Sequence, residues 1–144
     1  MQQLPLNFQS TAQANHRFEE AWTIKSGEHS SSCAIPPEFG GQGGGFSPED
    51  LFLQAAINCF VGTFKVVARL SKLSYSEVSV TGQLTVDKNE SGKIVMKSVH
   101  LDISVKDADR PDRLENIVSK TIRDGFILNS IRSDLTYQLQ QTSS

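Results

Sequence analysis

The longest apolar pattern in the chain lies between Ser47 and Leu73. Ser47 can cap a helix with its hydroxyl, and Pro48 suits the first helical position, which needs no amide hydrogen. Glu49 and Asp50 then place carboxylates at the positive end of the helix dipole. Apolar residues wrap nearly all sides of this stretch: Leu51, Phe52, Ala55, Ala56, Ile57, Cys59, Phe60, Val61, Phe64, Val66, Val67 and Leu70. We therefore predict a long, buried central helix.

Shorter alternating stretches precede this helix and predict strands. Residues 17–25 and 31–35 are separated by a turn-like segment around Gly27, which predicts a hairpin. Residues 1–14 are mostly polar, but an edge strand is predicted from the alternation of Leu4, Leu6 and Phe8.

A glycine-rich loop, PPEFGGQGGGF, connects the hairpin to the helix. Pro36 and Pro37 stop the preceding strand, and five glycines among positions 40–45 leave the backbone free to turn. The loop lacks the Gly-Lys-Ser/Thr ending of a phosphate-binding loop and the context of a dinucleotide fingerprint. We interpret it as an element that shapes the chain.

The second half of the chain alternates between strand and helix patterns. Residues 76–87 and 93–106 each place apolar side chains on one face, so they predict a long antiparallel hairpin packed on the helix. Residues 110–123 have helical spacing, residues 126–134 predict a short second helix, and residues 135–141 predict a closing strand. Together these elements predict a single α+β domain over residues 1–144.

Composition narrows the class of partner. The 144 residues carry a formal net charge of −2 and no cluster of Lys or Arg, which argues against nucleic acid or an anionic membrane. We see no apolar run of transmembrane length and no secretory signal at the start, so we expect a soluble, cytoplasmic protein. His16, His29 and His100 show no metal-ligand spacing, even with Cys33, and we predict no metal and no cofactor.

Two cysteines, Cys33 and Cys59, do not form a disulfide framework in a reducing compartment. Cys59 lies among apolar helix residues, where a cysteine is most often a small buried hydrophobe. A nucleophilic role would require a nearby cation, because an ordinary thiol, with a pKa of about 8.5, is only slightly ionised at neutral pH. The helix dipole fades within the first turn and lies too far from Cys59 to help.

The run PPEFGGQGGGFSPEDLFLQAAINCF, residues 36–60, resembles the signature of the OsmC/Ohr family, the osmotically inducible protein C and organic hydroperoxide resistance proteins. The resemblance extends in element order over essentially the whole chain. It implies an α+β fold of three strands, a central helix, two strands, two helices and a last strand. It also implies an intertwined homodimer with two sites at the subunit interface.

The resemblance implies thiol-dependent reduction of organic hydroperoxides, with Cys59 as the peroxidatic cysteine and Glu49 as the glutamate at the helix start. Arg17 lies near the place of the family arginine. It would stabilise the thiolate and the charge on the leaving oxygen, while Glu49 would hold its guanidinium in a bidentate pair. Apolar neighbours such as Phe46 and Phe52 would favour organic substrates, although they also suit a plain core.

One feature departs from the family pattern. A second cysteine is expected at the start of the penultimate helix, and Gly125 or a near neighbour stands there instead. The sulfenic acid on Cys59 would then need an external thiol to reduce it. Cys33 is the other internal candidate, and it is either a resolving cysteine or a buried, idle thiol. The alternative is a non-enzymatic OsmC-like dimer that binds a small molecule or a protein and has lost the redox pair.

Overall fold

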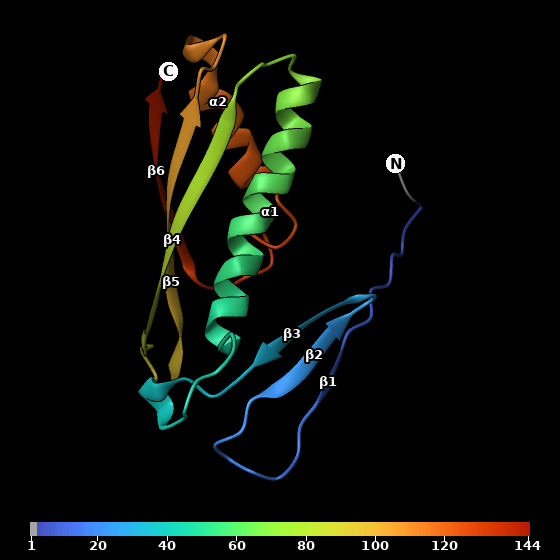
Figure 1. Cartoon of the computed structure of the whole chain (residues 1–144). Coiled ribbons are helices and arrows are strands. Elements are labelled where there is room, and N and C mark those ends of the chain that lie inside the picture. Colours follow the sequence, from blue (N-terminus) through green and yellow to red (C-terminus); the bar gives the residue numbers. More distant parts are fainter. Residues whose placement is uncertain (1–2) are drawn as a thin grey trace. The chain divides into compact units, whose positions relative to one another are not determined.

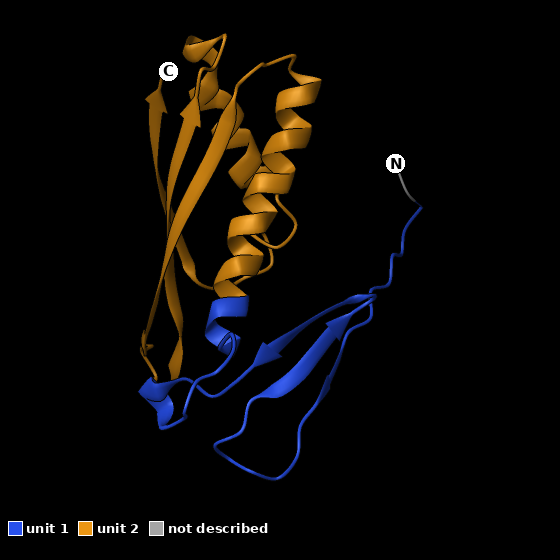
Figure 2. Cartoon of the chain, in the orientation of Figure 1, with its two compact units in different colours: residues 1–51 blue, residues 52–144 orange. Residues whose placement is uncertain are grey.

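The computed structural model describes residues 3–144. Met1 and Gln2, at the start of the predicted 1–144 domain, lie outside the described residues. The chain divides into two compact units, residues 1–51 and residues 52–144, coloured separately in Figure 2. The single domain over residues 1–144 remains a prediction.

The first unit contains a small antiparallel sheet in the order β1-β2-β3. Its strands are β1 (Thr11–Gln13), β2 (Trp22–Ser26) and β3 (His29–Cys33). The predicted hairpin is confirmed, with Gly27 in the left-handed conformation at its turn. The edge strand predicted at Leu4, Leu6 and Phe8 is wrong, because the strand that pairs with β2 is β1 instead.

The glycine-rich loop opens with a short 3-10 helix, η1 (Pro37–Phe39), and then turns back towards β3. Gly44 has a φ of +99°, which favours glycine, and a Cβ atom on Gly45 would lie 2.6 Å from the Ser32 carbonyl oxygen. This close approach lets the Phe46 amide donate to the Ser32 carbonyl at 2.9 Å. The loop therefore holds its shape through backbone contacts that only glycine permits.

The central helix, α1 (Pro48–Leu70), begins where the sequence predicts. The Asp50 amide donates to Ser47 Oγ and the Ser47 amide donates to Asp50 Oδ2, both at 2.9 Å, so the two residues cap the helix reciprocally. The helix ends three residues before Leu73, because Lys72 takes a left-handed conformation with a φ of 56°.

The second unit has a three-stranded sheet with both helices on one face (Figure 1). Its strands are β4 (Glu77–Lys88), β5 (Ile94–Lys106) and β6 (Asp134–Thr142). The β4-β5 hairpin is antiparallel as predicted, and β6 runs parallel to β5, which is the central strand. The second helix is α2 (Pro111–Asp124). Mixed helices and sheets confirm the α+β class.

The core of this unit lies between the helices and the sheet. Phe60 and Phe64 stack with their ring centroids 5.7 Å apart, and both are fully buried. Gly82 of β4 lets α1 approach, since a Cβ atom there would lie 2.9 Å from Ile57 Cδ1 and 3.0 Å from Leu53 Cδ1. Buried aliphatic residues complete the core: Val99, Leu101, Ile103, Val105, Leu114, Ile117 and Val118.

Two sequence expectations need correction. Residues 126–130 form turns rather than a second helix, with the Asn129 amide donating to the Gly125 carbonyl and the Ser130 amide to the Ile127 carbonyl. The buried residues of α1 form one stripe along the helix, whereas Val66 is 57% exposed. The all-round burial predicted for this helix is therefore incomplete in a single chain.

Helix α1 is also long and apolar enough, by length and composition alone, to cross a membrane. The expectation that no apolar run reaches that length is therefore wrong. Core helices of folded proteins meet the same criterion, and Phe60 and Phe64 bury one side of α1 in the core of the second unit. We interpret α1 as a core helix.

Candidate functional site

Cys59 lies in the middle of α1 as a free, partly exposed thiol. Its sulfur packs against Gly125, because a Cβ atom on Gly125 would lie only 3.0 Å from Cys59 Sγ. The same Cβ atom would lie 3.1 Å from Leu128 Cδ1. Glycine is therefore what allows the chain after α2 to approach the sulfur so closely. The position at which the resemblance expects a second cysteine is thus directly beside Cys59.

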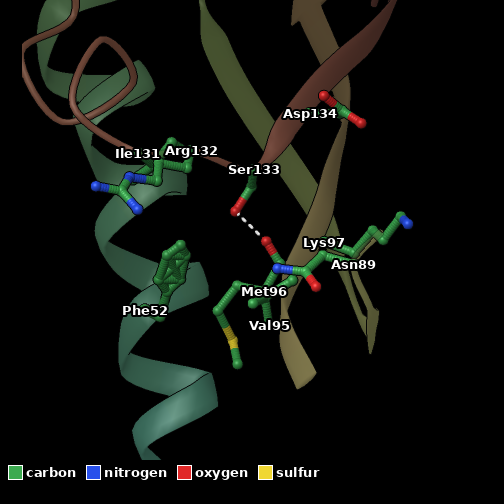
Figure 3. A pocket seen from close by; sticks show the side chains of 9 residues that line it. All are labelled: Phe52, Asn89, Val95, Met96, Lys97, Ile131, Arg132, Ser133 and Asp134. Carbon is green, nitrogen blue, oxygen red and sulfur yellow. Dashed lines mark hydrogen bonds between the residues drawn. The ribbon is translucent and has the colours of Figure 1, made fainter. Parts of the chain in front are cut away.

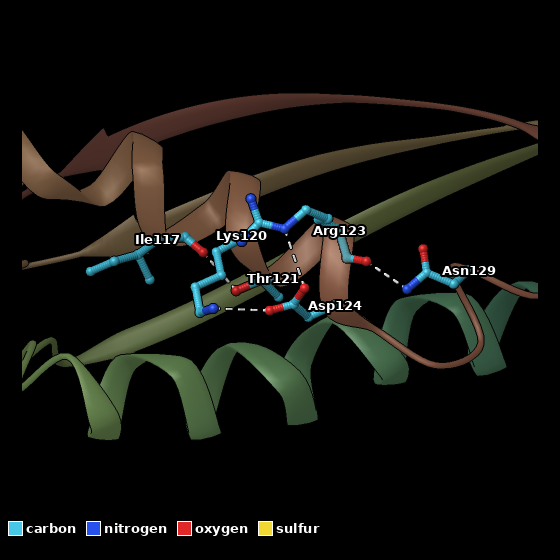
Figure 4. A network of polar contacts seen from close by, with 6 residues as sticks. All are labelled: Ile117, Lys120, Thr121, Arg123, Asp124 and Asn129. Carbon is cyan, nitrogen blue, oxygen red and sulfur yellow. Dashed lines mark hydrogen bonds and ion pairs between the residues drawn. The ribbon is translucent and has the colours of Figure 1, made fainter.

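Hydrogen bonds fix the place of Gly125 at the end of α2. Its amide donates to the Thr121 carbonyl at 3.0 Å, and the buried Thr121 hydroxyl donates to the Ile117 carbonyl at 2.8 Å. Asn129, within the turn segment, donates through its side-chain amide to the Arg123 carbonyl (Figure 4). Hydrogen bonds from Gly125 itself and from Asn129, which follows it, therefore hold this turn against the end of α2.

Asp124 adds an exposed ion pair to this end of the helix. Lys120 Nζ lies 3.1 Å from Asp124 Oδ2, and Arg123 Nε lies 3.3 Å from Asp124 Oδ1 (Figure 4). The hydrogen bond from Lys120 lowers the pKa of the Asp124 carboxyl, with a smaller contribution from Arg123. These contacts stabilise the end of the helix. The three charged groups pair with one another and not with Cys59.

Glu49 lies in the first turn of α1, as predicted. Its Oε1 atom is buried and accepts no hydrogen bond from any described residue. A buried carboxylate oxygen without a donor is costly, because it loses its water and gains nothing in return. Glu49 is therefore a carboxylate with unused capacity to accept a hydrogen bond from a cation.

Arg17 has a different partner from the one that the sequence suggests. Arg17 Nη1 donates to Glu20 Oε1 at 2.9 Å, and the two side chains are 61% and 40% exposed. Hydrogen bonds from Asn15 and then Arg17 lower the pKa of Glu20. Within residues 3–144 no hydrogen bond joins Arg17 to Glu49, so their pairing stays a prediction.

Cys33 is the last residue of β3 and is buried. It lies opposite Trp22 in the hairpin and is a free thiol, as is Cys59. No group of three potential metal ligands occurs in the part of the chain that the structure describes.

A pocket in the second unit involves residues that sequence reasoning did not bring together. It has a volume of about 480 Å³ and lies between Phe52 of α1, the start of β5 and the segment before β6 (Figure 3). Phe52 is predicted from the sequence as an apolar neighbour of Cys59, but no sequence signal points to Arg132. No motif links these residues, because they come together only when β6 pairs with β5.

The chain matches the OsmC family, described as OsmC-like protein, over residues 41–140. It is 36% identical over 92 residues to an organic hydroperoxide resistance protein of Xanthomonas axonopodis pv. citri, covering 62% of this chain and 63% of that protein. The chain spans about three fifths of the length of the curated relatives it matches.

Solved structures show the same fold. An OsmC-like protein of Mycoplasma pneumoniae has a TM-score of 0.83 at 12% identity, covering 96% of this chain and 99% of that chain. An organic hydroperoxide resistance protein of Legionella pneumophila has a TM-score of 0.74 at 23% identity, covering 99% of this chain and 100% of that chain. With the family match over more than half of its length, the chain belongs to the OsmC-like protein family.

Proposed function

We propose that this protein is a thiol-dependent peroxidase of the cytoplasm that reduces organic hydroperoxides through Cys59. The observation that carries the proposal is the free, partly exposed Cys59 thiol in the middle of α1. Membership of the OsmC-like family and the name of the Xanthomonas relative, an organic hydroperoxide resistance protein, support the same chemistry.

The proposed reaction has two halves. The Cys59 thiolate attacks one peroxide oxygen, the O–O bond breaks, and the other oxygen leaves as an alcohol after it takes up a proton. Cys59 is thereby oxidised by two electrons to a sulfenic acid. One external thiol condenses with it to a mixed disulfide and releases water, and a second thiol then releases reduced Cys59 and the disulfide of the reductant. We propose an external reductant because Gly125, which lies beside Cys59, offers no sulfur and Cys33 is buried.

We assign Arg17 and Glu49 to charge stabilisation. The Arg17 guanidinium would stabilise the thiolate and the negative charge that develops on the leaving oxygen, and Glu49 would orient it. The buried, unpartnered Oε1 atom of Glu49 supports this role, since a guanidinium would supply the missing donor. Exposed ion pairs contribute little to stability, so Arg17 can exchange Glu20 for Glu49 at small cost.

The spacing on α1 supports a site shared by two copies of the chain. Glu49 and Cys59 are ten residues apart on one helix, a rise of about 15 Å, which is more than one side chain spans. Glu49 therefore cannot contact the Cys59 sulfur of its own helix directly. We propose a homodimer in which Arg17 and Glu49 of one copy serve Cys59 of the other.

Turnover of cumene hydroperoxide with dithiothreitol tests the activity. Cys59→Ser should reduce the rate to that of the uncatalysed reaction, while Cys33→Ala, which removes the other thiol, should keep the wild-type rate. Equal rates for wild type and Cys59→Ser would refute the proposed reaction. If Cys33→Ala loses activity and Cys59→Ser keeps it, Cys33 and not Cys59 is the reactive thiol.

Mixed dimers test the shared site. Cys59→Ser and Glu49→Gln homodimers should each be inactive or strongly impaired. A mixed dimer retains one intact site if Cys59 and Glu49 come from different copies, so mixing the two variants should restore activity. If the residues act within one copy, mixing restores nothing, which would exclude the shared site without excluding the peroxidase.

A second function is favoured by two observations, namely the glycine beside Cys59 and the pairing of Arg17 with Glu20. Together they fit a non-enzymatic OsmC-like dimer that binds a small molecule or a protein after losing the redox pair. Dimedone trapping distinguishes the two functions, because a peroxidase forms a sulfenic-acid adduct at Cys59 under mild peroxide. Absence of the adduct, with a ligand that still copurifies, would support the binding protein.

A further inference from the structure

We propose that the pocket lined by Phe52, Met96 and Arg132 binds a small amphipathic carboxylate at a site separate from the Cys59 thiol. We call it the Arg132 pocket. Its volume of about 480 Å³ lies in the range of pockets that hold small-molecule ligands. All of its lining residues belong to the second unit, whose sheet and core hold them in place.

One side of the pocket is apolar. Phe52 comes from α1, Val95 and Met96 from β5, and Ile131 from the segment before β6, and each is only partly buried. Figure 3 shows the Phe52 ring and the Met96 side chain close together on this side. Apolar surface that the folded unit leaves partly uncovered gains free energy when a ligand removes it from water.

The polar side of the pocket is rich in hydrogen-bond donors. Arg132 is exposed, and no carboxylate within residues 3–144 forms an ion pair with it. Asn89 Oδ1 already accepts hydrogen bonds from Ser91 and from the Lys93 amide, which leaves the side-chain amide of Asn89 as a donor.

Charge also favours an anion. Lys97 also lines the pocket, but its Nζ donates to the Lys88 carbonyl at 3.0 Å, and Figure 3 shows its side chain extending away from Arg132, so Arg132 is the cation beside the apolar side. Asp134 is the one acidic lining residue, and Figure 3 shows it on the side opposite Arg132 and Phe52. A planar carboxylate matches the paired donors of a guanidinium, so Arg132 is the group that would select the head of the ligand.

Contacts within the second unit hold the walls of the pocket in place. The Ser133 hydroxyl donates to the Met96 carbonyl at 2.5 Å, which ties the segment before β6 to β5 (Figure 3). The parallel pairing of Ser98 with Asp134 continues this connection into the sheet. A preformed site spends little binding free energy on ordering its own walls.

The pocket is distinct from the thiol site. Neither Cys59 nor Gly125 lines it, and Phe52 precedes Cys59 by seven residues, or about 10 Å of helix rise. Binding of the carboxylate therefore does not require the thiol. This separation makes the inference independent of the proposed peroxidase activity.

Isothermal titration calorimetry with octanoate tests the proposal, with octanol as an uncharged probe of the same chain length. Wild type should bind octanoate in a saturable manner and more tightly than octanol. Arg132→Gln should weaken octanoate binding about tenfold, as expected for the loss of a charge-assisted hydrogen bond, and should bring the two probes close to equal affinity. Phe52→Ala should weaken both probes.

Matched controls decide the outcome. Arg110→Gln removes another exposed arginine of the second unit that does not line the pocket, and Cys59→Ser removes the thiol, so both should bind octanoate like wild type. Circular dichroism verifies that each variant is folded. Absence of saturable binding, equal affinity in Arg132→Gln and wild type, or loss of binding in Cys59→Ser would each overturn the proposal.

Discussion

The two units of the chain differ sharply in how much they bury. Residues 52–144 have strands of 12, 13 and 9 residues and a core of fully buried aromatic and aliphatic side chains. Residues 3–51 have strands of 3 to 5 residues, and their buried residues are Cys33, Ala34 and Ser47. A unit that buries so few side chains gains little free energy of folding from its own core. The second unit is therefore the scaffold of the fold.

The candidate chemistry is divided between the same two units. Cys59 lies in the well-packed second unit, whereas Arg17 and Glu49 lie in the first. The first unit also exposes large apolar side chains: Leu4, Leu6, Phe8, Phe18, Phe39 and Phe46. Exposed apolar surface and an unpartnered Glu49 oxygen both fit a surface that a second copy of the chain covers. The second unit thus holds the Cys59 thiol in place, and in the proposed dimer the other copy supplies the charged groups of Arg17 and Glu49.

The largest expected effect comes from the core of the second unit. Phe60→Ala should lower the free energy of unfolding by about 3–5 kcal/mol, because a fully buried ring leaves a cavity. The matched change in the first unit, Phe8→Ala, removes a ring that is 93% exposed and should change it by less than about 0.5 kcal/mol. Urea denaturation measures both, and similar losses would contradict the contrast between the units.

A second prediction concerns the contact between Gly125 and Cys59. Gly125→Ala should destabilise the second unit by about 1–3 kcal/mol, because its Cβ atom would crowd the Cys59 sulfur and Leu128. Gly125→Cys should instead form a disulfide with Cys59 under oxidising conditions. The Cβ atom at position 125 would lie 3.0 Å from Cys59 Sγ. In a disulfide, the Cβ atom of one cysteine lies about 3 Å from the sulfur of the other, so the geometry fits.

Thiol counting on denatured protein, before and after reduction, measures this disulfide. The same change made together with Cys59→Ser is the control and should leave every remaining thiol free. Persistence of free thiols in Gly125→Cys under oxidising conditions would show that the turn after α2 does not hold position 125 beside the sulfur.

A third prediction separates the two partners of Arg17. Arg17→Ala should abolish most peroxide turnover without measurable loss of stability, because the Arg17–Glu20 pair is exposed. Glu20→Gln should keep or raise turnover, since it frees Arg17 for Glu49. Steady-state kinetics and thermal unfolding measure both variants. If Glu20→Gln loses as much activity as Arg17→Ala, the Arg17–Glu20 pair itself is the functional arrangement.

The smallest expected effect is at the exposed end of α2. The contacts of Asp124 with Lys120 and Arg123 lower its pKa below the ordinary value of 3.8. Folding therefore favours the ionised carboxyl, and this stabilisation is present above pH 3.8 and is lost as the pH falls through the lower folded-state pKa. Asp124→Asn should flatten that part of the pH–stability profile slightly. Equal profiles for wild type and Asp124→Asn would contradict the prediction.

Local sequence signals located the main elements well. Ser47 as the cap and Pro48 at the first helical position mark the start of α1, and two-residue alternation around the turn at Gly92 marks the β4-β5 hairpin within one residue. These features depend on neighbours in the sequence, so a pattern is enough to find them. The resemblance to the OsmC-like family, read from residues 36–60, is confirmed by the family match.

The errors arise where distant residues decide the conformation. Residues 126–130 have a helical apolar pattern, but Gly125 packs against Cys59 in an extended conformation and interrupts the helix there. The Arg132 pocket depends on the parallel pairing of β5 with β6, for which the sequence has no local signal.

Local patterns are enough to predict the α+β class, the position of the central helix and the identity of the candidate thiol. Capping, periodicity and a single motif suffice for these, since each depends on residues close together in the chain. Folding brings Gly125 beside Cys59 and places Arg132 in a pocket with Phe52, and the sequence predicts neither contact. The physical reason is that side-chain contacts depend on how the turns, sheets and helices pack, and packing joins residues that no spacing in the sequence relates.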